Sequence, residues 1–344
     1  MPAAGAKLAE PRARSAHGLR RRPGDAQGLR IAMPSQGTPR AVRCGVRLAQ
    51  SRGMRVLIGI LLGLAFVVTG VAVASWRFQR RIDDESRALL AGARVSAGRL
   101  LQSSDLAPLP PPVRRWLEVS GAVGKPIADT VRLTQRGEMR TAPDKPWMPV
   151  SAQQYFSVDP PGFVWRVRAS MKGLPIAGRD RLAGGHGHML IKVASVIDVA
   201  NATGPEIDQG TLLRFLGEII WFPSAALSPA ITWEAIDATS ARATMRQAGV
   251  TATAVFGFDE RGRFDRLTAE RYMSIPGGSR LEPWTIPITE WRVVRGIEIP
   301  VRGNAIWKLA EGDFDYYRWE ILDVETDARG LYAEAPARPE QVAR

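Results

Sequence analysis

Cysteine and histidine are scarce in this chain of 344 residues, which contains one cysteine and three histidines. The single cysteine, Cys44, excludes a fold that is held together by disulfides. The body also lacks the G-x-S-x-G nucleophile elbow, the G-x-x-x-x-G-K-[ST] phosphate loop, the H-E-x-x-H zinc motif and a G-x-G-x-x-G before a helix. These absences disfavour a serine hydrolase and a cofactor-dependent enzyme, so we expect no cofactor and no bound metal.

Positive charge is abundant but unevenly distributed. The net charge is +13, and residues 1–53 contribute +9 of it, because they hold 11 of the 47 basic residues and only Glu10 and Asp25 as acids. The rest of the chain is nearly neutral and offers no basic face to a nucleic acid. Residues 1–53 have no apolar period, and we expect them to be a disordered basic segment or sequence upstream of a true start at Met54.

A long uncharged segment follows. No charged residue occurs from Val56 to Trp76, and these 21 residues would form a helix about 31 Å long, close to a hydrocarbon core of about 30 Å. Residues 72–74 read Ala-Val-Ala, as at a signal-peptidase site, but the apolar run is longer than a signal peptide requires. We therefore expect residues 54–76 to be an uncleaved transmembrane anchor.

Arginines flank this segment equally on both sides, so the positive-inside rule does not decide its orientation. One N-terminal anchor before a large body without cysteine favours the bacterial inner membrane, with the body on the extracytoplasmic side. Residues 77–126 are predicted to form a helical stalk, ended by the prolines from Pro108 to Pro112, and then a short helix with Val113, Trp116 and Leu117 on one face.

The body, residues 127–327, shows the alternation of β-strands. In residues 163–171, aromatic and aliphatic side chains alternate with Arg166 and Arg168, which indicates a half-buried strand. About ten such strands are separated by short Gly-rich or Pro-rich turns, which favours antiparallel neighbours. One helix from about Glu206 to Trp221 interrupts them. We predict a mainly β fold, a curved antiparallel sheet or open barrel with one covering amphipathic helix, followed by a disordered tail over 328–344.

Candidate polar groups gather near this helix. Glu206, Asp208 and Glu218 lie on it, and Asp180 lies upstream between Arg179 and Arg181. Acids in a first helical turn are favoured by the helix dipole, so structural charge is one interpretation and an acid/base pair is the other. The pair His186 and His188 would share one side of a strand, but lacks a third metal ligand and fits a hairpin tip.

Tryptophan is plentiful, with nine of its ten copies at Trp116 or beyond. Such rings either fill the core of a wide curved sheet or leave an apolar groove that can hold an acyl chain or a similar ligand. We name eight candidate ligand-binding residues and no catalytic ones: Trp165, Arg179, Asp180, Glu206, Asp208, Glu218, Trp221 and Trp233.

Six short sequences occur in a characteristic order: PVRRWL at 112–117, KPWMP at 145–149, DPPGFVW at 159–165, GRD at 178–180, GPEIDQG at 204–210 and WFP at 221–223. Together they resemble an uncharacterised bacterial family known only as a domain of unknown function, over roughly residues 108–327. More loosely, the strand series with its helix resembles the open half-barrel of periplasmic lipoprotein carriers. The anchor and the basic extension depart from those carriers and argue against a soluble shuttle.

The sequence thus predicts a membrane-anchored bacterial envelope protein whose body binds an apolar or lipid-like ligand without chemistry. Two alternatives stay open: a hydrolase-type enzyme that uses the Asp/Glu cluster near the helix, and a structural module that binds a partner. No nucleic-acid partner is expected, and the sequence does not define the oligomeric state.

Overall fold

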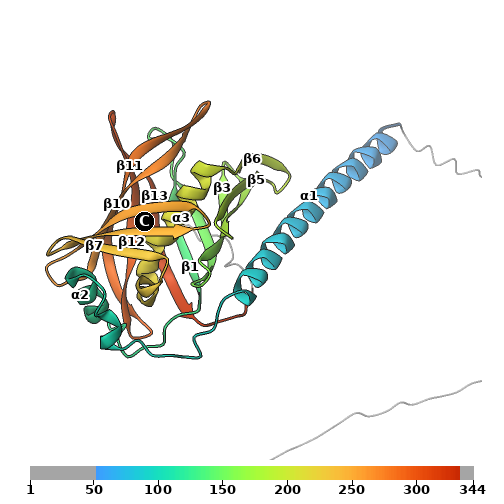
Figure 1. Ribbon diagram of the computed structural model, residues 1–344. Helices are drawn as coiled ribbons and strands as arrows, with labels where there is room; N and C mark the ends of the chain where they lie inside the picture. Colours follow the sequence, from blue (N-terminus) through green and yellow to red (C-terminus); the bar gives the residue numbers. More distant parts are fainter. Residues whose placement is uncertain (1–51, 334–344) are drawn as a thin grey trace, which may run out of the picture. The chain divides into compact units, whose positions relative to one another are not determined.

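A computed structural model describes residues 52–333 (Figure 1). Cys44, most of the expected disordered segment 1–53 and residues 334–344 of the expected tail lie outside the described residues. Residues 328–333 of that tail lie against the N-terminal helix and the body: Arg329 Nη1 donates to the Leu90 carbonyl at 3.3 Å, and the Tyr332 amide donates to the Tyr155 hydroxyl at 3.2 Å.

The described residues contain one antiparallel sheet of 13 strands, which confirms the predicted mainly β fold. Its centre is the pair β1 and β13, and each further strand is added beside its neighbour in sequence. We call β1–β6 the first wing: β1 (Thr130–Met139), β2 (Met148–Ser157), β3 (Gly162–Met171), β4 (Leu174–Ala183), β5 (His186–Val193) and β6 (Ile197–Ala202).

We call β7–β13 the second wing: β7 (Ile231–Asp237), β8 (Ser240–Gln247), β9 (Val250–Phe258), β10 (Phe264–Ile275), β11 (Gly278–Val294), β12 (Ile297–Leu309) and β13 (Gly312–Thr326). The sheet has more strands than the ten expected, because some lack a clear alternation. Strand β2 is an example, since its last eight positions are all buried and its polar residues, Ser151, Gln153, Gln154 and Ser157, fall on both faces.

The predicted covering helix is α3 (Pro205–Glu218), which continues into the 3-10 turns η2 (Ile219–Trp221) and η3 (Pro223–Leu227). This segment joins β6 to β7, the two edges of the sheet. It contacts β4 and β5 of the first wing and β8, β9 and β10 of the second, so it lies across the concave face (Figure 1).

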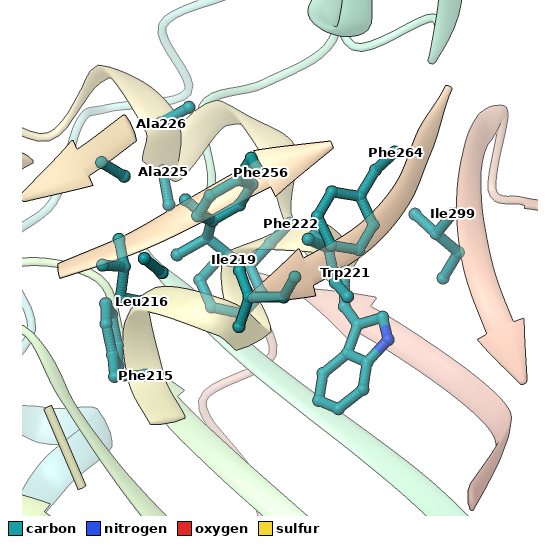
Figure 2. Close-up of a cluster of buried hydrophobic side chains, with 14 of the residues drawn as sticks. Phe215, Leu216, Ile219, Trp221, Phe222, Ala225, Ala226, Phe256, Phe264 and Ile299 are labelled. Carbon is teal, nitrogen blue, oxygen red and sulfur yellow. The ribbon is translucent and has the colours of Figure 1, made fainter. Parts of the chain in front are cut away.

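The main core lies between α3 and the concave face. Leu212, Leu213 and Leu216 are fully buried, as their helical spacing predicts. Phe215 and Phe222 pack on Phe156, with ring centroids 6.2 and 4.9 Å away. Figure 2 shows this cluster, with the indole of Trp221 extending away from Phe256 and Phe264.

The apolar segment forms one continuous helix with the predicted stalk, α1 (Arg52–Ala91). Residues Gly53–Ala91 are long and apolar enough to cross a membrane. The helix ends well before the prolines expected to end it, because Arg94 leaves the helix and donates its amide to the Asp159 carbonyl at 2.8 Å. A turn, η1 (Ser103–Leu106), and the expected short helix, α2 (Pro111–Val119), follow.

The C-terminal part of α1 packs on the convex face of the first wing. Phe78 and Ile82 form a second apolar cluster with Val164, Ala177 and Leu190. The arginine face of β3, expected to face solvent, is therefore partly covered: Arg166 is only 7% exposed and forms an ion pair with Asp83 of α1.

The sheet opens between two strands of the second wing. Strands β9 and β10 are paired from Phe258 and Phe264 as far as Val255 and Thr268. Beyond that point β10 continues to Ile275, paired only with β11. We call the resulting opening the β9–β10 split.

Candidate ligand-binding site

A cavity of about 260 Å³ lies between α3 and the concave face and is bordered by both wings. Its apolar lining includes Met139, Met189, Ile191, Ile220, Ile286 and Trp319. Five of the eight predicted residues also line it: Trp165, Arg179, Asp180, Glu218 and Trp221. The fold thus brings together residues from β3, β4 and α3 that are far apart in sequence.

Arg214 of α3 organises the polar wall of this cavity. Its Nε donates to Glu218 Oε1 at 2.8 Å, and its Nη1 donates to Asp180 Oδ2 at 2.9 Å. The guanidinium also lies 4.6 Å from the ring centroid of Trp165 and 5.0 Å from that of Phe163. Two carboxylates and two aromatic faces compensate the loss of water around this largely buried cation.

Glutamines extend the network to the centre of the sheet. Gln154 Nε2 donates to Glu218 Oε2 at 2.6 Å, and its Oε1 accepts from Arg214 Nη2 at 3.3 Å. Gln135 donates to the same Oε1 at 3.3 Å and accepts from the Tyr317 hydroxyl at 2.5 Å. The network links α3 to β1, β2 and β13 and fixes the side chains of the wall.

Burial and charge pairing together determine the pKa shifts of the wall. It raises the pKa of Glu218 above its ordinary value of 4.5, while Arg214 acts in the opposite direction. Burial also raises the pKa of Tyr317. Burial alone would lower the pKa of Arg214, but Glu218 and Asp180 outweigh it and the pKa is raised. Arg214 therefore stays charged, and Glu218 is shifted toward its neutral form.

Several buried polar atoms of cavity-lining residues have no hydrogen-bond partner among the described residues. They include the indole nitrogens Nε1 of Trp165 and Trp221 and the carboxylate oxygen Oδ1 of Asp180. Each of the three residues is more than nine-tenths buried. A buried donor or acceptor without a partner costs about 1–3 kcal/mol, so these atoms favour a ligand that supplies the missing hydrogen bonds.

The second wing contributes another polar group to the cavity. Arg271 of β10 lies over two indoles, with its Cζ 4.9 Å from the ring centroid of Trp284 and 5.9 Å from that of Trp307. Its Nη1 and the Trp284 Nε1 each donate to the Tyr316 hydroxyl at 3.2 Å. Arg271, Trp284 and Tyr316 all line the cavity.

The remaining acidic candidates lie elsewhere. Glu206 is exposed at the start of α3. Asp208 accepts from the Gly187 amide at 2.6 Å and contacts His186 Nδ1 at 3.2 Å. Because a Cβ at Gly187 would lie 2.4 Å from Thr211 Oγ1, the glycine allows α3 to approach β5 closely. Asp208 thus attaches the helix to the sheet, and neither acid lines the cavity.

The two histidines have separate partners: His186 contacts Asp208, whereas His188 Nε2 lies 2.8 Å from Asn201 Oδ1. Within residues 52–333, no three His, Cys, Asp or Glu side chains are grouped so that they could hold a metal ion.

Two further candidates, Arg179 and Trp233, make contacts that hold the fold together. Arg179 borders the cavity, but it follows the alternation of β4, in which the adjacent Asp180 faces inward. The Arg179 side chain therefore extends toward the convex face, where its Nε lies 3.0 Å from Glu85 Oε2 of α1. Burial lowers the pKa of Arg179 to about 10, against the effect of Glu85. Trp233 packs edge-on against Phe256 at 4.9 Å and donates to the Ala226 carbonyl at 2.9 Å, away from the cavity.

Sequence reasoning missed Arg214, Gln154, Gln135, Tyr317 and Arg271. One signal was present for Arg214, since it stands between Leu213 and Phe215 on a helix that is buried almost all round and lies four residues before Glu218. Gln135 also continues the inward positions of Val131 and Leu133 on β1. Arg271 likewise lies on the apolar face of β10 with Leu267, Ala269 and Met273, whereas Arg266, the other arginine of that strand, lies on the opposite face.

A comparison with protein-family models matches residues 99–319 to the family described as "Family of unknown function (DUF6544)". The chain belongs to this family. The match confirms the resemblance to a domain of unknown function that the six short sequences indicated. No curated protein matched the chain. Among solved structures, a LolA superfamily protein from Nitrosomonas europaea is similar, with a TM-score of 0.36 and 14% identity over 63% of this chain and 94% of that one.

Proposed function

We propose that this member of the DUF6544 family binds an apolar or lipid-like ligand in the cavity between α3 and the concave face. The observation that carries the proposal is the combination of an aromatic and aliphatic lining with the unpartnered, buried nitrogens of Trp165 and Trp221. Ligand sites are typically largely apolar, with a few placed polar groups that fix orientation. An amphiphile would fill the volume and accept the two hydrogen bonds.

We also propose that α1 anchors the body to the bacterial inner membrane, with the body on the extracytoplasmic side. The support is the length and apolar character of the first part of α1. The C-terminal part of the same helix packs on the convex face, so the anchor and the ligand-binding body would form one continuous unit close to a lipid surface.

Mass spectrometry of lipids co-purified with the full chain tests ligand binding. The parent protein should carry an amphiphile in roughly stoichiometric amount. The variant Ile286→Trp places an indole among the lining residues and should lose most of the bound mass, whereas Ile236→Trp, at a position 47% exposed on β7, should not. Equal bound mass in all three proteins would show that the lipid is held elsewhere.

One observation favours a second candidate function, an acid/base enzyme. Asp180 and Glu218 both contact Arg214 and both line the cavity, which is the juxtaposition that such a pair requires. The full-chain variant Glu218→Ala separates the two functions. An unprocessed ligand that accumulates only in the variant indicates an enzyme, while the same ligand in both proteins indicates binding alone.

A further inference from the structure

Arg271 is a cation without a carboxylate partner. No ion pair of Arg271 is found within the described residues, although most other arginines of the body have one, and its Nε is buried without a hydrogen-bond acceptor. Its neighbour Glu270 points to the opposite face of β10 because successive strand residues alternate. Asp180 and Glu218, the two carboxylates of the cavity, are bonded to Arg214 instead.

The groups around Arg271 are donors. The Tyr316 hydroxyl oxygen already accepts hydrogen bonds from Arg271 and from Trp284, and residues 52–333 provide no acceptor for its own proton. The rings of Trp284 and Trp307 attract the cation through their faces but cannot accept a conventional hydrogen bond from its Nε. The carboxylate of Glu282, opposite Arg271 on β11, is ion-paired with Arg280, so no carboxylate of the described residues is bonded to the Arg271 guanidinium.

The space beside the guanidinium is that of the cavity, which Arg271 lines. On the side of α3 the neighbouring residue is Gly210, where an added Cβ would be in van der Waals contact, 3.7 Å from Arg271 Nε and 3.9 Å from its Nη2. Trp284 lines both the cavity and a separate, wider recess of about 610 Å³ at the β9–β10 split, whose wall carries the polar residues Thr253 and Thr268 and the opposite charges of Glu270 and Lys308. A charged group at Arg271 would thus lie close to solvent while an attached chain occupies the apolar interior.

We infer that Arg271 and Tyr316 bind the anionic head group of an amphiphile whose apolar chain fills the cavity. The head group is a carboxylate or a phosphate monoester, and the inference rests on the proposed function. The guanidinium offers Nε and Nη2, and the Tyr316 hydroxyl offers a third donor. Charge-assisted hydrogen bonds of this kind are about twice as strong as neutral ones, so the site discriminates by charge as well as by chain.

Competition among three probes of equal chain length tests this inference. Full-length protein in a non-ionic amphipol is equilibrated with equal amounts of dodecanoate, dodecyl phosphate and dodecan-1-ol, and the bound amounts are measured by mass spectrometry. The parent should bind one of the anionic probes in about tenfold or greater excess over the alcohol. Of dodecanoate and dodecyl phosphate, the one bound in the larger amount identifies which head group fits.

The variants locate this preference. Arg271→Met should reduce the ratio of anion to alcohol about tenfold, Tyr316→Phe should reduce it by a smaller factor, and Arg246→Met, at an exposed position of β8, should leave it unchanged. A parent that binds all three probes equally overturns the head-group inference but leaves the proposed function intact. A folded parent that binds none of them overturns both. If Arg271→Met does not fold, an unchanged ratio in Tyr316→Phe contradicts the inference.

Discussion

The two faces of the first wing bury arginines in opposite ways. On the convex face, Arg166 and Arg179 pair with Asp83 and Glu85 of α1 beside an apolar cluster, and the recess that borders Arg166 there has a mainly polar lining. On the concave face, Arg214 is equally well paired, but the cavity that it lines is mainly apolar, and the indole nitrogens of Trp165 and Trp221 in its lining have no partner among the described residues. Buried charge is structural on one side, whereas on the other it forms the wall of a site.

The concave face depends on α3, and one change there should have the largest effect. Leu216→Asp puts a carboxylate into a fully buried apolar position, and we expect a loss of about 5 kcal/mol or more of unfolding free energy, enough to unfold a marginal domain. The matched change Leu322→Asp, at a position 42% exposed on β13, should cost about 1 kcal/mol or less. Near-ultraviolet circular dichroism measures both. A Leu216→Asp protein that melts like the parent would show that the helix face is not packed.

The second largest effect is expected from a direct comparison of two buried arginines, Arg214 and Arg179. Arg214→Met leaves Asp180 and Glu218 buried without their cation and should cost about 3–5 kcal/mol. Arg179→Met should cost less, because Glu85 keeps Arg81 at 3.1 Å and Arg181 at 3.6 Å. Urea unfolding of the two variants gives the difference. Equal losses of unfolding free energy would mean that Arg81 and Arg181 do not compensate for the missing Arg179.

A triple variant, Arg214→Met with Asp180→Asn and Glu218→Gln, serves as the control for that comparison. It removes the cation and both negative charges together, so it should recover part of the stability that Arg214→Met loses. No recovery would assign the loss to packing of the Arg214 stem on Trp165 and Phe163 rather than to uncompensated charge.

The sequence predicts the strands better than it predicts the site, for a physical reason. Alternation and glycine turns are local, so they predict β3 and the turn at Gly184-Gly185, and helical spacing predicts the buried leucines of α3. The cavity depends on strand order, and no local pattern reveals that Trp165 on β3 and Tyr317 on β13 lie with ring centroids 6.5 Å apart. Arg179 was assigned to the site because nothing in GRD shows that α1 covers the convex face.

The smallest effect is a pH dependence confined to the concave face. Because the pKa of Glu218 is raised in the folded protein, its contribution to stability is complete below the ordinary value of 4.5 and is lost as pH rises through the folded pKa. Each unit by which the pKa is raised corresponds to about 1.4 kcal/mol. Carboxyls with lowered pKa values, such as those of Asp259 and Glu320, act in the opposite sense, because they lose stability only as pH falls below their ordinary values.

Urea unfolding between pH 4.5 and 8 should therefore show that the unfolding free energy of the parent declines as pH rises. The variant Glu218→Gln should lack this decline, and Glu234→Gln, at an exposed glutamate, should retain it. A decline that persists in Glu218→Gln would place the responsible group outside the cavity wall.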